Sequence, residues 1–123
     1  MFEDVVKRLA SFGYEVIEAD EWVVNFLVGK ATDEICNFCN VNEIPEALHR
    51  IAVDMVCGEF LLAKKGTGHL DGFDVETAVK TLKEGDTSIT FAVSDNSITL
   101  DGFINLLMTS GKSQFVAFRR LRW

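Results

Sequence analysis

One stretch of the chain, residues 44–65, constrains the fold more than any other. It reads IPEALHRIAVDMVCGEFLLAKK, and its proline stands where a first helical turn begins. Apolar residues recur through it at helical spacing, and past Met55 they occupy almost the whole circumference. The pattern predicts a helix that ends at Gly66, after two lysines that suit the negative end of the helix dipole. We therefore expect a central helix with Ile51, Met55 and Phe60 deeply buried, against which the other elements pack.

Two earlier stretches have the same helical spacing. Residues 2–12 predict a short amphipathic helix stopped by Gly13, and residues 21–40 predict a second long helix with Asp20 as its N-cap. Residues 41–44 are too short to do more than link this helix to the central one, so the two should pack antiparallel. The apolar stripe expected to face the core, flanked by Trp22, consists of Val23, Phe26, Leu27, Ala31, Ile35 and Phe38.

The helical spacing of apolar residues ends after residue 65. Three glycines within seven residues predict a loop. Residues 75–82 alternate in polarity at period two but could also form helical turns, whereas residues 88–93 are β-branched and aromatic and predict a strand. The simplest interpretation is a β-hairpin that turns at residues 84–86. A helical domain offers it no sheet to join, so the hairpin either packs on the helices or has its open edges completed by a neighbouring subunit.

A third long helix should follow, capped by Asp95, Asn96 or Ser97 and ended by Gly111. Leu107 belongs to its buried stripe, and the residues up to 118 can add one more helical turn. The sequence thus predicts a mainly α fold, a small antiparallel bundle of three to four helices with one protruding hairpin and an extended tail. As one domain over residues 1–123, it divides into a helical core (2–65 and 97–117), a loop and hairpin (66–94) and a tail (118–123).

The tail, residues 118–123, reads FRRLRW. Its three arginines stand on a chain with 12 Lys and Arg against 19 Asp and Glu, a net charge of −7. Arginine and tryptophan are the residues most enriched at binding hot spots, so the tail is a candidate docking segment; the alternative is a frayed terminus. The acidic balance disfavours binding to naked nucleic acid through a broad basic face. We expect no signal peptide, and no apolar run reaches membrane length.

The motifs that could carry chemistry are weak. Cys36 and Cys39 form a C-x-x-C, but they lie inside a predicted helix without a second such motif, and the odd total of three cysteines is typical of reduced thiols in the cytosol. The Gly-Thr-Gly at residues 66–68 lacks the strand and the Lys-Ser/Thr of a phosphate loop. His49 has no partners for general-base catalysis. Four carboxylates miss the spacing of a calcium loop, namely Asp71, Asp74, Glu84 and Asp86. We therefore expect no catalytic, cofactor-binding or metal-binding residues.

Taken together, these features resemble the small head–tail connector proteins of tailed bacteriophages and prophage-derived particles, also called DNA-packaging or head-completion adaptors. The resemblance covers essentially the whole chain. Three segments carry it: the helix from IPEAL (44–48) through VDMVCGEF (53–60), the segment VKTLKEGDTSITF (79–91), and the tail FRRLRW. The middle segment, with its Glu-Gly-Asp turn, is the most specific, and none of the three is a catalytic signature.

The resemblance implies a virion protein, assembled in the bacterial cytoplasm, that forms a ring of usually twelve subunits at the neck between head and tail. Its partners would be further copies of itself, the portal protein and a tail-side completion or terminator protein, with DNA passing through the channel and no membrane contact. By the same resemblance the tail docks on the portal, through Phe118, Arg119, Arg120, Leu121, Arg122 and Trp123. The hairpin region would supply ring or tail contacts, through Val79, Thr81, Ile89, Thr90, Phe91 and Val93.

Two other classes of function compete with this interpretation. A small regulatory or DNA-binding helical domain of a prophage would need a helix with outward lysines and arginines suited to a groove, and no predicted helix has one. A thiol-dependent enzyme would have to be built on Cys36 and Cys39 alone. The sequence does not distinguish a phage from a defective prophage or a tail-like bacteriocin.

Overall fold

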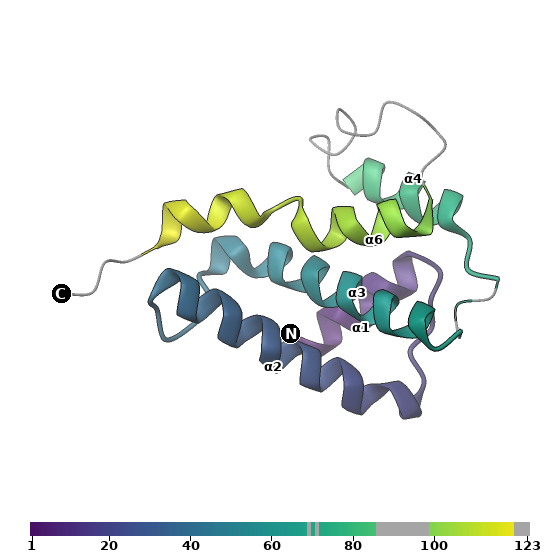
Figure 1. The fold of residues 1–123 in the computed structure, drawn as a ribbon, viewed down its shortest axis with the longest axis horizontal. Coiled ribbons are helices and arrows are strands. Elements are labelled where there is room, and N and C mark those ends of the chain that lie inside the picture. Colours follow the sequence, from purple (N-terminus) through teal and green to yellow (C-terminus); the bar gives the residue numbers. More distant parts are fainter. Residues whose placement is uncertain (69, 71, 86–98, 120–123) are drawn as a thin grey trace.

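The computed structural model describes residues 1–68, 70, 72–85 and 99–119, and these are mainly helical (Figure 1). They form five α-helices and three short 3-10 helices (η), and they contain no β-strand. The elements in chain order are α1 (Phe2–Ser11), η1 (Glu18–Asp20), α2 (Glu21–Cys39), η2 (Glu46–Leu48), α3 (His49–Gly66), α4 (Val75–Gly85), α6 (Leu100–Thr109) and η3 (Lys112–Phe118). No helix in the described ranges is both long enough and apolar enough to cross a membrane.

Helix α3 is the central element, as its sequence predicts. It contacts α1, α2 and α6, and Figure 1 shows it between α2 below and α6 above. The helical run begins with η2 directly after Pro45 and ends at Gly66, as expected from those two residues. The antiparallel pairing with α2 is also confirmed, because Lys30 of α2 reaches Glu59 of α3, far from the loop that joins the two helices.

Helix α6 lies unusually close to α3, and Gly58 makes this possible. A Cβ atom at Gly58 would lie 2.6 Å from Cγ of Met108, 3.0 Å from Cβ of Leu107 and 3.2 Å from the backbone oxygen of Ile104. The absence of a side chain therefore lets the two helix backbones approach. Helix α6 runs antiparallel to α3, since Asp101 at its start pairs with Lys65 at the end of α3.

The core forms two clusters along α3. The larger joins α1, the first half of α2, the middle of α3, α4 and α6, with Phe12 and Phe103 in edge-to-face contact at 5.1 Å. The smaller lies at the other end of the bundle, where η3 covers α2 and α3, and its buried residues are Ile35, Cys39, Leu48, Ala52, Met55 and Phe115.

Four of the six residues predicted to be deeply buried are so, namely Met55, Phe60, Ile35 and Leu107. The prediction of deep burial is wrong for Ile51, which is half-buried and packs against the smaller cluster. The prediction for Phe26 is wrong, because its side chain is 56% exposed. Phe38, also predicted to face the core, is exposed as well. The residues of α2 that do face the core lie on a narrower stripe, namely Val24, Leu27, Ala31, Ile35 and Cys39.

Helix α1 ends as predicted, by a left-handed glycine. Gly13 has φ +95°, its N–H donates to the oxygen of Ala10, and the N–H of Tyr14 reaches back to the oxygen of Leu9 at 2.9 Å. This double hydrogen bond satisfies carbonyls that the end of a helix otherwise leaves open.

The predicted hairpin is wrong in its first half. Residues 75–85, which include both the expected first strand and most of the expected turn, form helix α4. Asp74 starts this helix: its carboxylate accepts hydrogen bonds from the N–H of Thr77 at 3.2 Å and from the hydroxyl of Thr77. Ala78, Val79 and Leu82 then face the core at helical spacing. The expected second strand, residues 88–93, lies outside the described residues.

Asp20 is the N-cap residue of α2, as predicted, but its side chain makes no capping hydrogen bond. The reason is that η1 runs directly into α2, and the N–H of Glu21 already bonds to the oxygen of Glu18. The last long helix begins later than predicted, and its cap is Thr99, whose hydroxyl accepts from the N–H of Gly102 at 3.1 Å. The three expected caps at 95–97 lie outside the described residues.

Candidate interaction surfaces

The root of the C-terminal tail is fixed to helix α2. Phe115 of η3 is buried, and its ring lies 6.0 Å from the ring of Phe38. The thiol of Cys39 donates to the backbone oxygen of Phe115 at 3.6 Å. The guanidinium of Arg119 lies 5.4 Å from the centre of the Phe38 ring, a distance at which the cation and the ring face attract. The chain therefore enters the tail from a defined position, beyond the end of α2 (Figure 1).

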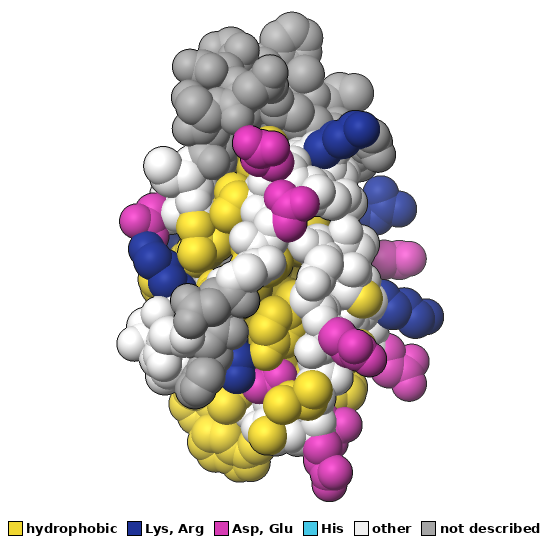
Figure 2. Space-filling view, turned by 90° about the vertical axis from the view of Figure 1, so that its right-hand side faces the viewer, with side chains coloured by type: hydrophobic (Ala, Val, Ile, Leu, Met, Phe, Trp, Pro, Cys, Tyr) yellow, Lys and Arg dark blue, Asp and Glu magenta, His cyan; other side chains and the backbone are white. Residues whose placement is uncertain are grey.

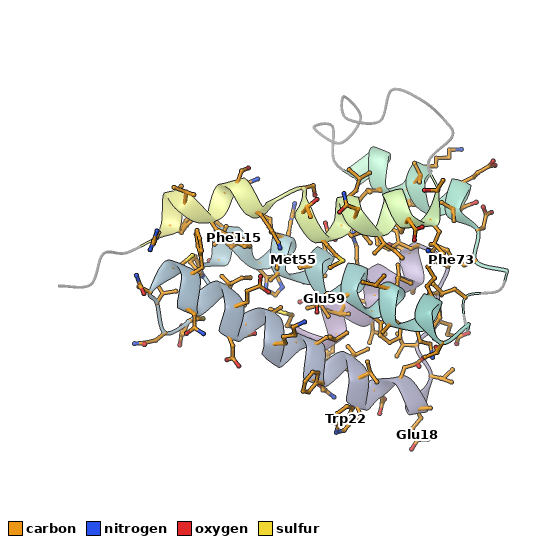
Figure 3. All side chains as sticks on the ribbon, in the orientation of Figure 1. Glu18, Trp22, Met55, Glu59, Phe73 and Phe115 are labelled. Carbon is orange, nitrogen blue, oxygen red and sulfur yellow. The ribbon has the colours of Figure 1, made fainter. Side chains whose placement is uncertain are left out.

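A second surface is an aromatic pair near the start of α2. Trp22 and Phe26 stack with ring centres 5.4 Å apart and planes inclined by 14°. They are 72% and 56% exposed, so each ring covers the other while both remain open to solvent. Figure 3 shows Trp22 pointing away from α3 and α6. On the face drawn in Figure 2, hydrophobic side chains gather at the lower edge, where α2 begins.

A third surface is a polar groove of about 720 Å³ between α1, the first half of α3, and the end of α6 with the start of η3; we name it the α1–α3 groove. Arg8 and Asp54 form an ion pair in it at 2.9 Å, and Nε2 of His49 lies 2.9 Å from Oδ2 of Asp4. The hydrogen bond with His49 lowers the pKa of Asp4 below its ordinary value. The lining residues are Asp4, Lys7, Arg8, Ser11, His49, Arg50, Ile51, Val53, Asp54, Leu107, Ser110, Gly111 and Gln114.

Two cations of the α1–α3 groove form no direct ion pair in the described ranges, although the charge of Lys7 helps to lower the pKa of Asp4. Lys7 and Arg50 are exposed, and neither forms an ion pair there. Five other cations are paired with carboxylates, namely Arg8, Lys30, Lys64, Lys65 and Lys112. The lining holds three cations, Lys7, Arg8 and Arg50, against the two carboxylates Asp4 and Asp54, and this small positive excess on an acidic chain is named the positive rim.

Asp20 carries the most buried charge of the described residues, and its contacts hold parts of the fold together. Asp20 is 3% exposed and accepts hydrogen bonds from Nζ of Lys64 at 2.8 Å, from the hydroxyl of Tyr14 at 2.8 Å and from the N–H of Ile17 at 3.3 Å. Burial opposes the charge of Asp20, but these hydrogen bonds outweigh burial and lower its pKa. The same hydrogen bond raises the pKa of Lys64, and burial together with Asp20 raises that of Tyr14. With all its partners in place, this cluster fastens α3 to the segment before α2.

The three cysteines are free thiols. Cys39 and Cys57 are buried, and Cys36 is half-buried. Burial raises the pKa of Cys36 and of Cys57, which makes these thiols poorer nucleophiles than an exposed cysteine. In the described ranges no three His, Cys, Asp or Glu side chains are placed to hold a metal ion.

Of the twelve residues predicted to mediate contacts, the structure describes four. Phe118 ends η3 and Arg119 follows it; Val79 is buried in the core by α4, and Thr81 donates to the oxygen of Thr77 within that helix. The other eight lie outside the described residues and stay predictions: Ile89, Thr90, Phe91, Val93, Arg120, Leu121, Arg122 and Trp123.

Neither the exposure of the aromatic pair nor the α1–α3 groove was predicted from the sequence. The spacing of four between Trp22 and Phe26, with Glu18 and Glu21 beside them, was a signal for an outward face. The groove left no comparable signal, because its cations come from different helices.

Comparison with protein-family models, curated proteins and solved structures finds no match to this chain.

Proposed function

We propose that this chain is a structural assembly protein, which acts by binding other proteins. More specifically, we propose that it is a head–tail connector: a ring-forming adaptor at the neck of a tailed phage or a prophage-derived particle. In this role it joins the portal vertex of the capsid to the tail and extends the DNA channel. The sequence resemblance suggests the role, and the arrangement at the root of the tail is the structural observation that supports it.

That arrangement suits a docking tail. The stack of Arg119 on Phe38, and the packing of Phe115 against α2, fix where the tail leaves the bundle. The backbone of Arg119 is extended, with φ −71° and ψ 127°. The residues that follow combine two arginines, a leucine and a tryptophan. Arginine can donate two hydrogen bonds to one carboxylate, and tryptophan buries a large rigid surface, so a short segment of this composition can bind a groove on a partner.

Charge favours this role over the competing DNA-binding domain. The chain carries −7, and five of its cations are neutralised by ion pairs within the fold. A protein that holds DNA through its phosphates needs unpaired cations on one continuous face. A channel that DNA passes through needs the opposite, a surface from which DNA is readily released.

The test is portal binding by a chain that lacks residues 120–123. This deletion keeps Arg119 on Phe38 and leaves the described fold intact, so the far-UV circular dichroism should not change. We expect the full-length protein to form a high-order ring in native mass spectrometry and to bind the portal protein of its own particle, more weakly at high salt. The deleted chain should lose portal binding, repetition around the ring having amplified a weak contact in the full-length protein.

A matched control is Lys112→Ala, which removes a cation of η3 whose ion pair with Glu34 is long, at 3.9 Å, and exposed. This variant should bind the portal as the full-length protein does. Unchanged portal binding by the deleted chain would overturn the docking role and favour the alternative interpretation of residues 120–123 as a frayed terminus.

A further inference from the structure

We propose that copies of this chain bind one another head to tail, with the aromatic pair of one copy (Trp22 and Phe26) seated in the α1–α3 groove of the next. The proposal rests on the ring-forming function proposed above and names the two surfaces that would close the ring. Three features of the molecule support it: the exposure of the pair, the charges around each surface and the placement of the two surfaces on the fold.

The aromatic pair is a preformed hot spot. Trp22 and Phe26 already stack at 5.4 Å and lie one helical turn apart on a long helix, so little side-chain freedom remains to be lost on binding. Buried aromatic side chains, tryptophan above all, dominate the energetics of protein interfaces. Two large rings open to water on a chain of this size are therefore best explained by a partner that covers them.

The α1–α3 groove is complementary in shape and polarity. Its volume of about 720 Å³ leaves room for aromatic rings, and half-buried Ile51 supplies the apolar surface of its lining, since Val53 and Leu107 lie almost fully buried behind it. Lys7 and Arg50 are the exposed cations on its rim, without ion-pair partners among the residues described.

The charges select a second copy of this chain as the occupant. Glu18 and Glu21 are exposed beside the aromatic pair, and neither has an ion pair within the described ranges. Two copies of a chain with net charge −7 repel one another unless opposite charges meet where they touch. The positive rim of the groove and the acidic start of α2 provide this match, and their contact would neutralise charges that each fold leaves open.

The placement of the two surfaces determines the form of the assembly. The groove is lined by α1, α3, α6 and η3, and no residue of α2 contributes to it. Figure 3 shows Trp22 on the side of α2 that faces away from α6. The two surfaces therefore do not overlap, so one copy can use both at once. Such a contact is heterologous, and repetition of it generates a closed ring or an open filament rather than a dimer.

The experiment uses two full-length variants, each with one surface disabled. Trp22→Ser with Phe26→Ser disables the aromatic pair, and Lys7→Glu with Arg50→Glu disables the groove; all four side chains are exposed. Asp33→Lys, an exposed charge reversal in the second half of α2 and outside both surfaces, is the matched control. In native mass spectrometry each double variant alone should be monomeric at a concentration about tenfold above that at which the unmodified protein assembles. The control should assemble normally.

Mixing the two double variants gives the decisive result. One intact pair and one intact groove remain in the mixture, so it should form a one-to-one dimer and nothing larger. This dimer would also show that both variants are folded. A chain that combines Lys7→Glu and Arg50→Glu with Glu18→Lys and Glu21→Lys should regain assembly, because both signs are reversed together.

The contrary outcomes are distinct from failure of the proposed function. If either double variant still forms rings, or if the mixture stays monomeric, this contact is wrong while a ring-forming connector stands. If the groove variant assembles and the aromatic variant does not, the pairs bind each other and the head-to-tail arrangement is overturned. If the unmodified protein is monomeric at every concentration, alone and with portal, both proposals fail.

Discussion

The ammonium group of Lys64 lies 2.8 Å from Oδ1 of Asp20, and the carboxylate that it contacts is almost completely buried. The two residues are 44 positions apart in the sequence. Their contact ties the end of the central helix to the turn that precedes α2, beside the exposed aromatic pair. Because the pKa of Asp20 is lowered, the contact also makes the stability of the fold depend on pH.

The sign of this dependence follows from the pKa. A carboxylate whose folded pKa is lowered contributes stability above its unfolded pKa, about 3.9, and this stability is lost as the pH falls through the lower folded value. The free energy of unfolding should therefore fall below about pH 4. In Asp20→Asn this fall should be smaller, and the free energy of unfolding at pH 7 should be ~1–3 kcal/mol lower, since the partners of the carboxylate lose a charged acceptor.

Urea denaturation at pH 7, 4 and 3 measures both effects. The control is Asp33→Asn, an exposed carboxylate in the second half of α2, which should change the free energy of unfolding by less than ~0.5 kcal/mol. An acid response that is identical in Asp20→Asn and the unmodified protein would contradict the role of Asp20.

Gly58→Ala should destabilise the fold although alanine favours a helix. The new Cβ would lie 2.6 Å from Cγ of Met108 and would press on the backbone of α6, at a cost of ~1–3 kcal/mol. Gly29→Ala is the matched control, because a Cβ atom there meets nothing within 4 Å. It should stabilise α2 by roughly 0.5–1 kcal/mol. Chemical denaturation of both variants provides the measurement, and equal effects of the same sign would rule out a close contact at Gly58.

Met55→Ala should affect the stability of the monomer, whereas Phe26→Ala should affect self-association. Met55 lies on α3 and is buried in the smaller core cluster, so truncation should lower the free energy of unfolding by ~2–5 kcal/mol. Phe26 is exposed, so truncation should change the stability of the monomer by less than ~0.5 kcal/mol while weakening self-association. Denaturation at low protein concentration measures the first effect. A value below ~0.5 kcal/mol for Met55→Ala would refute the central placement of α3.

The cysteines should be reduced and free of metal. Titration with a thiol reagent should modify Cys36 first and slowly, because burial raises its pKa, whereas Cys39 and Cys57 should react only after unfolding. Replacing Cys36 and Cys39 together with alanine should leave assembly intact. Stoichiometric zinc in the purified protein, lost in that double variant, would show that the C-x-x-C motif binds metal.

The sequence by itself determined the helical elements that rest on strong local signals. The run from Pro45 to Gly66 has apolar residues on nearly every side, and only a central position in a bundle can bury them all. Gly13 and the short link at 41–44 likewise act through local geometry, and the structure bears them out. The composition of residues 118–123 pointed to an interaction segment, and it stays a prediction beyond Arg119.

Only the tertiary structure decided the features that depend on what packs against what. Residues 75–82 satisfy period two and the helical period together, and contact with the core selected the helix, which buries Ala78, Val79 and Leu82 on one side. Helix α2 carries apolar residues around more than half of its circumference. Packing against the rest of the core buries Val24 and Leu27 and leaves Trp22 and Phe26 exposed to solvent. The α1–α3 groove exists only where α1, α3, α6 and η3 meet, so local patterns in the sequence could not reveal it.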